Sequence, residues 1–152
     1  MPTTKHCSNI SKNEGMYRFY NSSQTNKLYV DFCEVKEDSI IIGQGGNFNI
    51  HIDNKFTASK HVCVIQLIEQ NINLLKYVFY IIPIIQHTII VNGSVINWLN
   101  KSNIKIIQIP IPKDKQYLKS IVEKISKPID EKIEKEKKNK ELENNVKEII
   151  EN

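Results

Sequence analysis

Short apolar runs separated by polar turns fill the chain from Tyr17 to Ile111, and almost none repeats at the spacing of a helix. The runs are rich in isoleucine, valine, tyrosine and phenylalanine, which fit the pleated surface of a sheet. In Phe48-Asn49-Ile50-His51-Ile52 apolar and polar residues alternate, which is the period of a half-buried strand. We therefore predict strands at Tyr17–Tyr20, Leu28–Cys33, Ser39–Ile42, Phe48–Ile52, His61–Ile68, Tyr77–Ile82, Thr88–Val91, Val95–Leu99 and Ile104–Ile109.

The dipeptide Asn92-Gly93 lies between two of these runs and is a strong signal for a two-residue hairpin turn. Both turn residues must accept positive φ, which asparagine and glycine do readily. Several short strands at close spacing indicate a β-sandwich or a barrel.

Beyond Pro110 and Pro112 the pattern becomes helical, because Leu118, Val122 and Ile125 recur at three and four residues. Ser126-Lys127-Pro128 predicts a break and a restart. From Ile129 onward the helix is charged, with glutamate–lysine pairs at i,i+4 and few apolar positions. It is either a solvated single helix or one that pairs with a partner helix or with a second copy of the chain. The predicted organisation is a loose polar tail over 1–15, a β domain over 16–111 and a charged helical extension over 112–152.

Composition narrows the class of protein. Hydrophobic residues at 40% and charged residues at 25% are globular values. The three scattered cysteines exclude a secreted disulfide framework, and no apolar run is long enough to cross a bilayer. These features predict an intracellular protein without membrane contact.

Charge and motifs restrict the chemistry. The net charge is +4; residues 130–152 carry six lysines and eight acidic residues, which leaves +6 on 1–129. This mild basic bias suits an acidic partner and is not diagnostic of nucleic acid, so we predict that nucleic acid is an unlikely partner. No triad order, HExxH, P-loop or paired-carboxylate motif is present. We therefore predict no enzymatic activity, no cofactor and no metal.

Three features in the β region carry a family resemblance. Ile42-Gly43-Gln44 ends one strand, Ser59-Lys60-His61 opens another, and Val91-Asn92-Gly93 forms the hairpin. Their order and spacing resemble a forkhead-associated (FHA) domain over residues 16–111. The resemblance implies an all-β, FHA-like β-sandwich (SMAD/FHA type) with a C-terminal α-helical extension. It also implies that loops at one end of the sandwich bind a phosphothreonine peptide.

Carried over by position, the resemblance keeps the structural residues and changes the recognition residues. The structural motif residues are Gly43, His61, Asn92 and Gly93. Gln44 stands at the family arginine, and His87 and Thr88 stand at the peptide-holding asparagine and the glycine that follows it. Counting back from His61 puts Ala58 at the family serine, Ser59 at its arginine and Lys60 next, whereas a one-residue deletion makes Ser59-Lys60 the pair. The candidate phosphopeptide-binding residues are Gln44, Ser59, Lys60, His87 and Thr88.

The predicted function is a non-enzymatic interaction module that binds a phosphothreonine or acidic peptide within an intracellular complex. Two alternatives remain. The first is a degenerate FHA scaffold that serves in assembly or oligomerisation without binding phosphate. The second is a KH-like RNA-binding domain, because Ile42-Gly43-Gln44-Gly45-Gly46 matches the Ile-Gly-x-x-Gly loop of that family. The period of two that follows the loop favours a strand over the helix that a KH domain has there.

Overall fold

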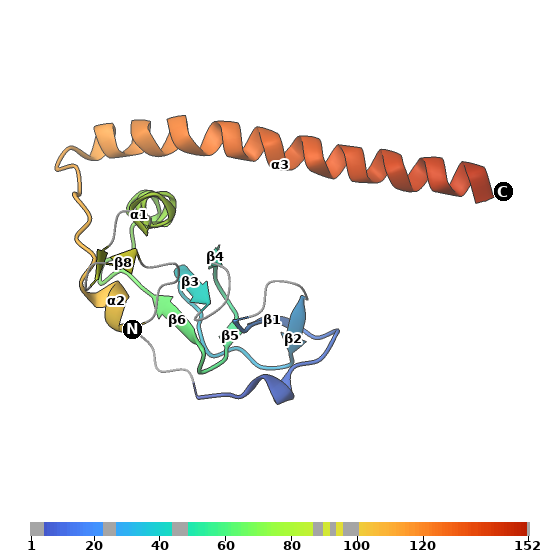
Figure 1. The fold of residues 1–152 in the computed structure, drawn as a ribbon, viewed down its shortest axis with the longest axis horizontal. Coiled ribbons are helices and arrows are strands. Elements are labelled where there is room, and N and C mark those ends of the chain that lie inside the picture. The colour runs from blue at the N-terminus through green and yellow to red at the C-terminus, as the bar shows by residue number, and fades with distance from the viewer. Residues whose placement is uncertain are drawn as a thin grey trace. The chain divides into compact units, whose positions relative to one another are not determined.

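A computed structural model describes residues 5–22, 27–43, 49–86, 90–91, 94–95 and 101–151 (Figure 1). The chain divides into two compact units, Met1–Ile111 and Pro112–Asn152.

The first sheet of the larger unit joins β1 (Tyr17–Tyr20), β2 (Leu28–Val30) and β5 (Thr57–Ala58) in the order β2-β1-β5. β1 runs antiparallel to β2 and parallel to β5. A second three-stranded sheet has the order β4-β3-β6 and is antiparallel throughout. It is built from β3 (Ser39–Gly43), β4 (Ile50–Asp53) and β6 (Val62–Ile65).

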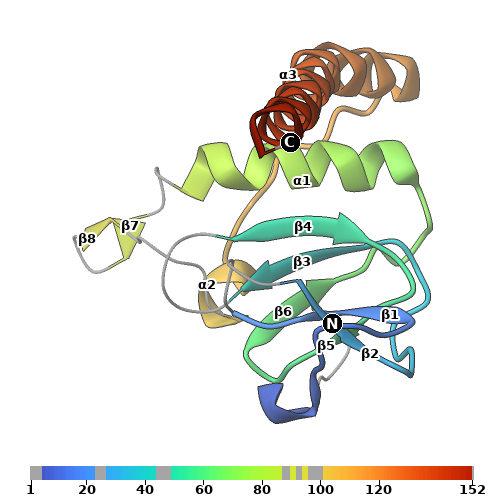
Figure 2. The ribbon, with the colours of Figure 1, turned by 90° about the vertical axis from the view of Figure 1, so that its right-hand side faces the viewer.

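The central strand β3 is buried along its whole length. Its run Ile40-Ile41-Ile42 is continuously apolar because both faces of this strand are covered. Ile41 packs with Tyr20, Phe56 and Val62 in the core between the two sheets. The other face of the sheet is covered by helix α1 (Ile72–Gln86), so the unit has three layers, helix on sheet on sheet (Figure 2).

Helix α1 corrects the predicted strand at Tyr77–Ile82. Asn71 starts the helix, because its Oδ1 accepts a hydrogen bond from the Leu74 N–H at 3.1 Å. Leu75, Val78 and Ile82 form a buried stripe at helical spacing. The residues between them are also largely apolar, so the sequence shows no polar face from which the period could be read.

The segment after α1 also departs from the prediction. β7 (Ile90–Val91) and β8 (Ser94–Val95) pair as an antiparallel hairpin, as expected, while its turn lies outside the described residues. The predicted strand at Ile104–Ile109 is instead helix α2 (Lys101–Lys105) followed by irregular chain. Tyr77 donates its hydroxyl hydrogen to the Pro110 carbonyl at 2.8 Å. This bond holds the irregular chain next to α1, where the two border an apolar hollow of about 220 Å³.

The smaller unit contains helix α3 (Lys115–Glu151). Asp114 Oδ1 accepts hydrogen bonds from the N–H groups of Gln116 and Tyr117, at 2.7 and 3.2 Å, which caps its first turn. The helix continues through Pro128, so the predicted break at Ser126–Pro128 is wrong.

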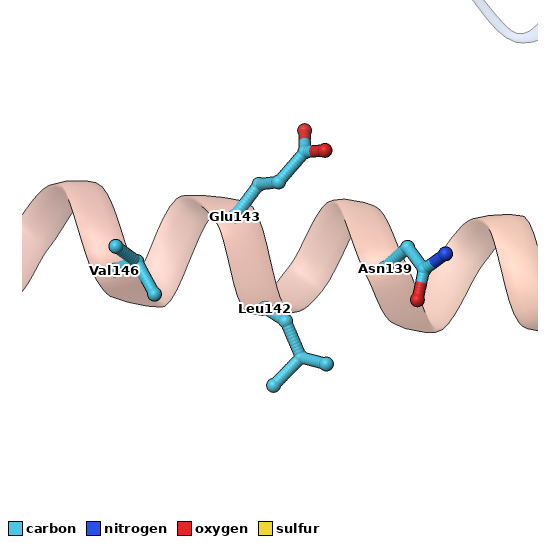
Figure 3. Close-up of a pocket in the computed structure, with 4 residues that line it drawn as sticks. All are labelled: Asn139, Leu142, Glu143 and Val146. Atoms are coloured by element: carbon cyan, nitrogen blue, oxygen red, sulfur yellow. The ribbon is translucent and has the colours of Figure 1, made fainter.

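The far part of α3 carries apolar side chains on its surface. Leu142 is 61% exposed and Val146 is 52% exposed. Leu142 and Glu143 leave the helix in different directions (Figure 3). The shallow hollow beside them is lined by residues of this one helix. No helix among the described residues is both long and apolar enough to cross a membrane.

The predicted all-β fold is therefore wrong, because α1 forms a full layer of the larger unit and α2 replaces an expected strand. Among the described residues, the predicted strands that the structure keeps belong to three small sheets, of which only β2-β1-β5 mixes parallel and antiparallel pairing.

Candidate nucleic-acid interface

Several chain segments meet at the end of the larger unit where β1 and β3 finish. Gly43, the last residue of β3, is the register partner of Val62, which follows His61. The Ser59 N–H donates to the Tyr20 carbonyl at 2.8 Å, so the segment after β5 lies beside the end of β1. We call this end the rim and define it by Asn21, Ser22, Gly43, Asn49 and Ser59–His61.

Gly43 is the point of closest approach within the rim. Its N–H donates to the Asn49 carbonyl at 3.0 Å. A Cβ placed on Gly43 would lie 3.3 Å from Asn49 Nδ2 and 3.4 Å from Ser22 Cα. Glycine therefore lets the start of β4 and the chain after β1 close around the end of β3.

The Ser59–Val62 turn shows which groups the rim can offer to a ligand. Its four N–H groups are used within the chain. Ser59 donates to the Tyr20 carbonyl, Lys60 to the His6 carbonyl at 2.9 Å, His61 to Ser59 Oγ at 3.3 Å and Val62 to the Ser59 carbonyl at 3.1 Å. Ser59 is fully buried. What the turn exposes is the side chains of Lys60 and His61.

The other residues singled out from the sequence are placed as follows. Ser59 lies inside, where its hydroxyl orders the turn and does not face solvent. Gln44, His87, Thr88, Asn92 and Gly93 lie outside the described residues. Within the described part of the chain, the structure therefore presents Lys60 and His61 together, next to Gly43.

Charge is distributed unevenly between the two ends of the sheets. The rim residues include Lys60 and no carboxylate, and the sequences of the adjoining segments 23–26 and 44–48 also contain none. The opposite end carries Glu37 and Asp38 before β3 and Asp53 at the end of β4, together with the lysines Lys36 and Lys55. Because only the rim has a lysine without neighbouring carboxylates among its residues, it suits an anionic ligand better than the opposite end does.

A polar cluster next to the rim links β1 to β4. Tyr20 donates its hydroxyl hydrogen to Asp53 Oδ2 at 2.7 Å, and its ring centroid lies 5.1 Å from that of His51. Arg18, the single arginine of the chain, lies over the rings of Tyr20 and Tyr29 at 5.3 and 5.4 Å. Because these residues link β1 to β4, they fix the two strands that lead to Asn21 and Asn49.

This environment shifts two pKa values. Burial, together with the hydrogen bond and negative charge of Asp53, raises the pKa of Tyr20 to about 12, although Arg18 acts in the opposite direction. Burial, followed by the positive charge of Arg18, lowers the pKa of His51. Tyr20 and His51 therefore stay neutral at physiological pH. Sequence reasoning missed this cluster, because its members lie on strands that are distant in the chain.

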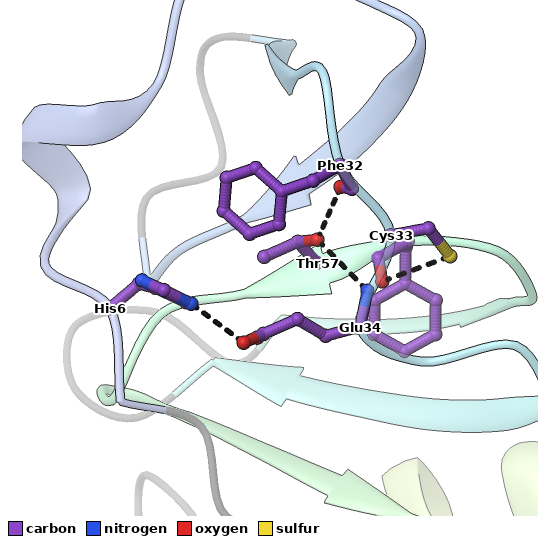
Figure 4. A network of polar contacts seen from close by, with 6 residues as sticks. His6, Phe32, Cys33, Glu34 and Thr57 are labelled. Carbon is purple, nitrogen blue, oxygen red and sulfur yellow. Dashed lines mark hydrogen bonds and ion pairs between the residues drawn. The ribbon is translucent and has the colours of Figure 1, made fainter.

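The N-terminal segment forms part of the rim's support and is not the loose tail that we expected. His6 bridges Ser59, and Lys12 bridges Tyr29 with two backbone hydrogen bonds of 2.9 Å. The His6 side chain lies 2.6 Å from the Glu34 carboxylate (Figure 4). No group of three potential metal ligands occurs within the described ranges.

Together these features define a mixed α/β unit with an uncharged-to-basic polar rim and no carboxylate in it. A model of the family described as "Type I restriction modification DNA specificity domain" matches residues 3–144. The chain belongs to this family.

The fold has a counterpart among solved structures. The chain is similar to a type I restriction-modification system S subunit from M. genitalium, with a TM-score of 0.66 and 21% sequence identity. The match covers 88% of this chain and 37% of that one, so the chain spans little more than a third of that subunit. None of the curated proteins compared with the chain matches it.

Family membership corrects the predicted identity and function. The FHA resemblance is wrong, and so are the phosphopeptide-binding function and the degenerate FHA scaffold derived from it. The KH alternative is also wrong, because strand β4 begins at Ile50 where that fold requires a helix. The prediction that nucleic acid is an unlikely partner is wrong for a DNA specificity domain. The prediction that the chain is not an enzyme is confirmed, since the family is a recognition component.

Proposed function

We propose that the larger unit recognises a DNA sequence for a type I restriction-modification system. The observation that carries this proposal is the match of residues 3–144 to the DNA specificity domain family. Such a domain acts on DNA inside the cell, which agrees with the intracellular location expected from the sequence. We further propose that this location is the cytoplasm of a bacterium.

Within the larger unit, the rim suits DNA better than the opposite end does. Lys60 and His61 are exposed on a turn that the chain's own hydrogen bonds fix. Lysine can pair with a phosphate or with guanine, while the half-buried Asn21 and Ser22 and the exposed His61 carry groups that can hydrogen-bond base edges or the backbone. At the opposite end Glu37, Asp38 and Asp53 offset the lysines, which makes that end less suitable for the phosphates of a duplex.

The experiment begins with selection. The 152-residue chain is incubated with a pool of random duplexes of about 30 base pairs, bound duplexes are amplified and sequenced, and the dissociation constant of an enriched duplex is measured by fluorescence anisotropy at several salt concentrations. Lys60→Gln should weaken binding and lower the slope of log Kd against log salt by about 0.9, the loss of one phosphate contact. Lys36→Gln makes the same change of charge at an exposed position beside the acidic end, and it should leave the slope unchanged. If no sequence is enriched, the recognition function is overturned. Equal effects of the two variants would overturn the placement at the rim.

Helix α3 has a separate role in this proposal. Its surface carries Leu142 and Val146, and ion pairs such as Lys132–Glu136 and Glu134–Lys138 stabilise it as a long helix. We propose that this helix attaches the recognition unit to other helical parts of the restriction-modification system. Leu142→Gln should weaken co-purification with the methylation subunit of that system, and Glu143→Gln, which keeps both exposed apolar side chains, should not. Unchanged retention of Leu142→Gln would contradict this role.

A further inference from the structure

The Lys60 turn is fixed from outside by a segment more than fifty residues away in the chain. The His6 carbonyl accepts the Lys60 N–H at 2.9 Å, and His6 forms a parallel bridge with Ser59. Ser59, at the start of the turn, donates its N–H to the Tyr20 carbonyl at 2.8 Å, and the N–H groups of His61 and Val62 are bonded within the turn itself. β1 therefore holds Ser59, and the N-terminal segment holds the next residue, Lys60, through His6.

The side chain of His6 is itself held in place. Its Nε2 lies 2.6 Å from Glu34 Oε1, and its ring meets the Phe32 ring edge-on with the centroids 5.2 Å apart (Figure 4). Glu34 is fixed in turn, because its N–H donates to Thr57 Oγ1 at 3.3 Å next to β5. Contacts thus run from Thr57 in β5 to Glu34, from Glu34 to His6, and from His6 to the turn that follows β5.

Global stability is a weak explanation for this arrangement. The side chains of His6 and Glu34 are 31% and 37% exposed, and Phe32 is 42% exposed. Ion pairs at such exposure contribute little to the stability of a fold. What the pair does determine is the position of the His6 carbonyl, and through it the position from which the Lys60 side chain leaves the surface.

We propose that His6, held by Glu34, is a positioning residue for Lys60 in DNA recognition. This inference rests on the proposed function and on the placement of Lys60 at the interface. Release of His6 would let the Lys60 turn move, so that its ammonium group no longer reaches the same phosphate or base. Small misplacements of a charged contact reduce affinity and specificity without unfolding the domain.

A second ion pair of the N-terminal segment provides a matched control. Lys12 Nζ lies 2.7 Å from Asp31 Oδ2 and fixes the segment to the end of β2. Both side chains are more than half exposed. Asp31→Ala therefore removes an ion pair of similar length from the same N-terminal segment, away from Lys60.

The test is a double-mutant cycle on the 152-residue chain, with an enriched duplex as the probe and a scrambled duplex of the same length as the competitor. His6→Ala and Glu34→Ala should each weaken binding about threefold or more in the otherwise unchanged chain. In the Lys60→Gln background neither should have a further effect. His6→Gln, whose amide can still donate to Glu34, should restore part of the affinity. Asp31→Ala should leave binding unchanged in both backgrounds.

Each result separates the inference from the proposed function. If Lys60→Gln itself changes nothing, the placement of Lys60 at the interface is overturned, and the inference with it. If Lys60→Gln weakens binding while His6→Ala acts by the same factor in both backgrounds, only the inference is overturned. Glu34→Ala leaves the backbone of the N-terminal segment intact, so it gives the same decision if His6→Ala does not fold.

Discussion

Tyr20 joins the two sheets just below the rim, and its removal should destabilise the larger unit in a pH-dependent way. The hydroxyl is 2.7 Å from Asp53 Oδ2, and the tyrosine is 8% exposed. A hydrogen bond to a charged group in such a place contributes about 1.5 kcal/mol. Tyr20→Phe should therefore lower the free energy of unfolding by about 1.5 kcal/mol at pH 8.

The raised pKa fixes the pH dependence of this difference. The folded pKa of Tyr20 is about 12 and its ordinary value is 10.0. Because the folded pKa lies above the unfolded one, the stabilisation is complete below pH 10 and is lost as the pH rises toward 12. The full loss is about 2.7 kcal/mol for two pKa units, and about half of it has occurred by pH 11. The wild-type chain should therefore lose nearly all of its advantage over Tyr20→Phe between pH 8 and pH 11.

Urea unfolding followed by circular dichroism at pH 8 and pH 11 measures both quantities. Tyr117→Phe is the control, since Tyr117 is 60% exposed, and it should change the free energy of unfolding by less than about 0.5 kcal/mol at either pH. The reasoning is refuted if Tyr20→Phe costs no more than this control at pH 8. It is also refuted if the wild-type chain and Tyr20→Phe lose stability in parallel up to pH 11.

Three further predictions test other parts of the structure. The folded pKa of His51 is lowered, so its stabilising contribution is complete above the ordinary pKa of 6.5 and is lost as the pH falls. His51→Gln should therefore show a smaller drop in urea midpoint between pH 7.5 and pH 5 than the wild-type chain. Gly43→Ala should cost about 1 kcal/mol in urea unfolding, because the new Cβ would push the Asn49 amide away by a few tenths of an ångström. No measurable cost would contradict the close packing at the rim. Asp114→Ala removes the cap of α3 and should lower its stability by about 1 kcal/mol, seen as reduced helical circular dichroism on heating, while Lys113→Ala should not.

The pattern of β-branched residues predicted strands such as β1 and β3 correctly. It did not predict helix α1, which has no polar face. β1 and β3 lie within one residue of their predicted bounds, because their side chains face a core on one or both sides. In α1 the stripe of Leu75 and Val78 is buried, yet half-buried Phe79 and Tyr80 are apolar as well. A helix period needs a contrast between faces, and these residues provide none.

The candidate site could be predicted only in part, for a related reason. The closeness of Gly43 to the Ser59–His61 turn follows from strand pairing, which local patterns can suggest. The hydrogen bond from Lys60 to His6 joins segments that share no pattern, so only the folded chain reveals it. The same holds for Arg18, whose neighbours Tyr20 and His51 come from different sheets.

DNA was missed as the ligand in the sequence analysis, because net charge is a poor guide to whether a domain recognises a DNA sequence. A phosphopeptide and a duplex both offer phosphate oxygens, so a lysine beside a glycine-ended strand suits either. Bulk positive charge reports mainly the sequence-independent part of DNA affinity. The sequence-dependent part comes from uncharged donors and acceptors that meet base edges, and these add nothing to the net charge. The rim side chains that are not buried are Lys60, His61, Asn21 and Ser22. Such a rim is compatible with a DNA-recognition domain of only +6 over 1–129, provided that few phosphates are contacted and the bases carry the specificity. With so few phosphate contacts, the affinity for DNA should depend only weakly on salt. If the lysines scattered over the larger unit instead held the duplex by charge alone, the affinity would fall steeply with salt.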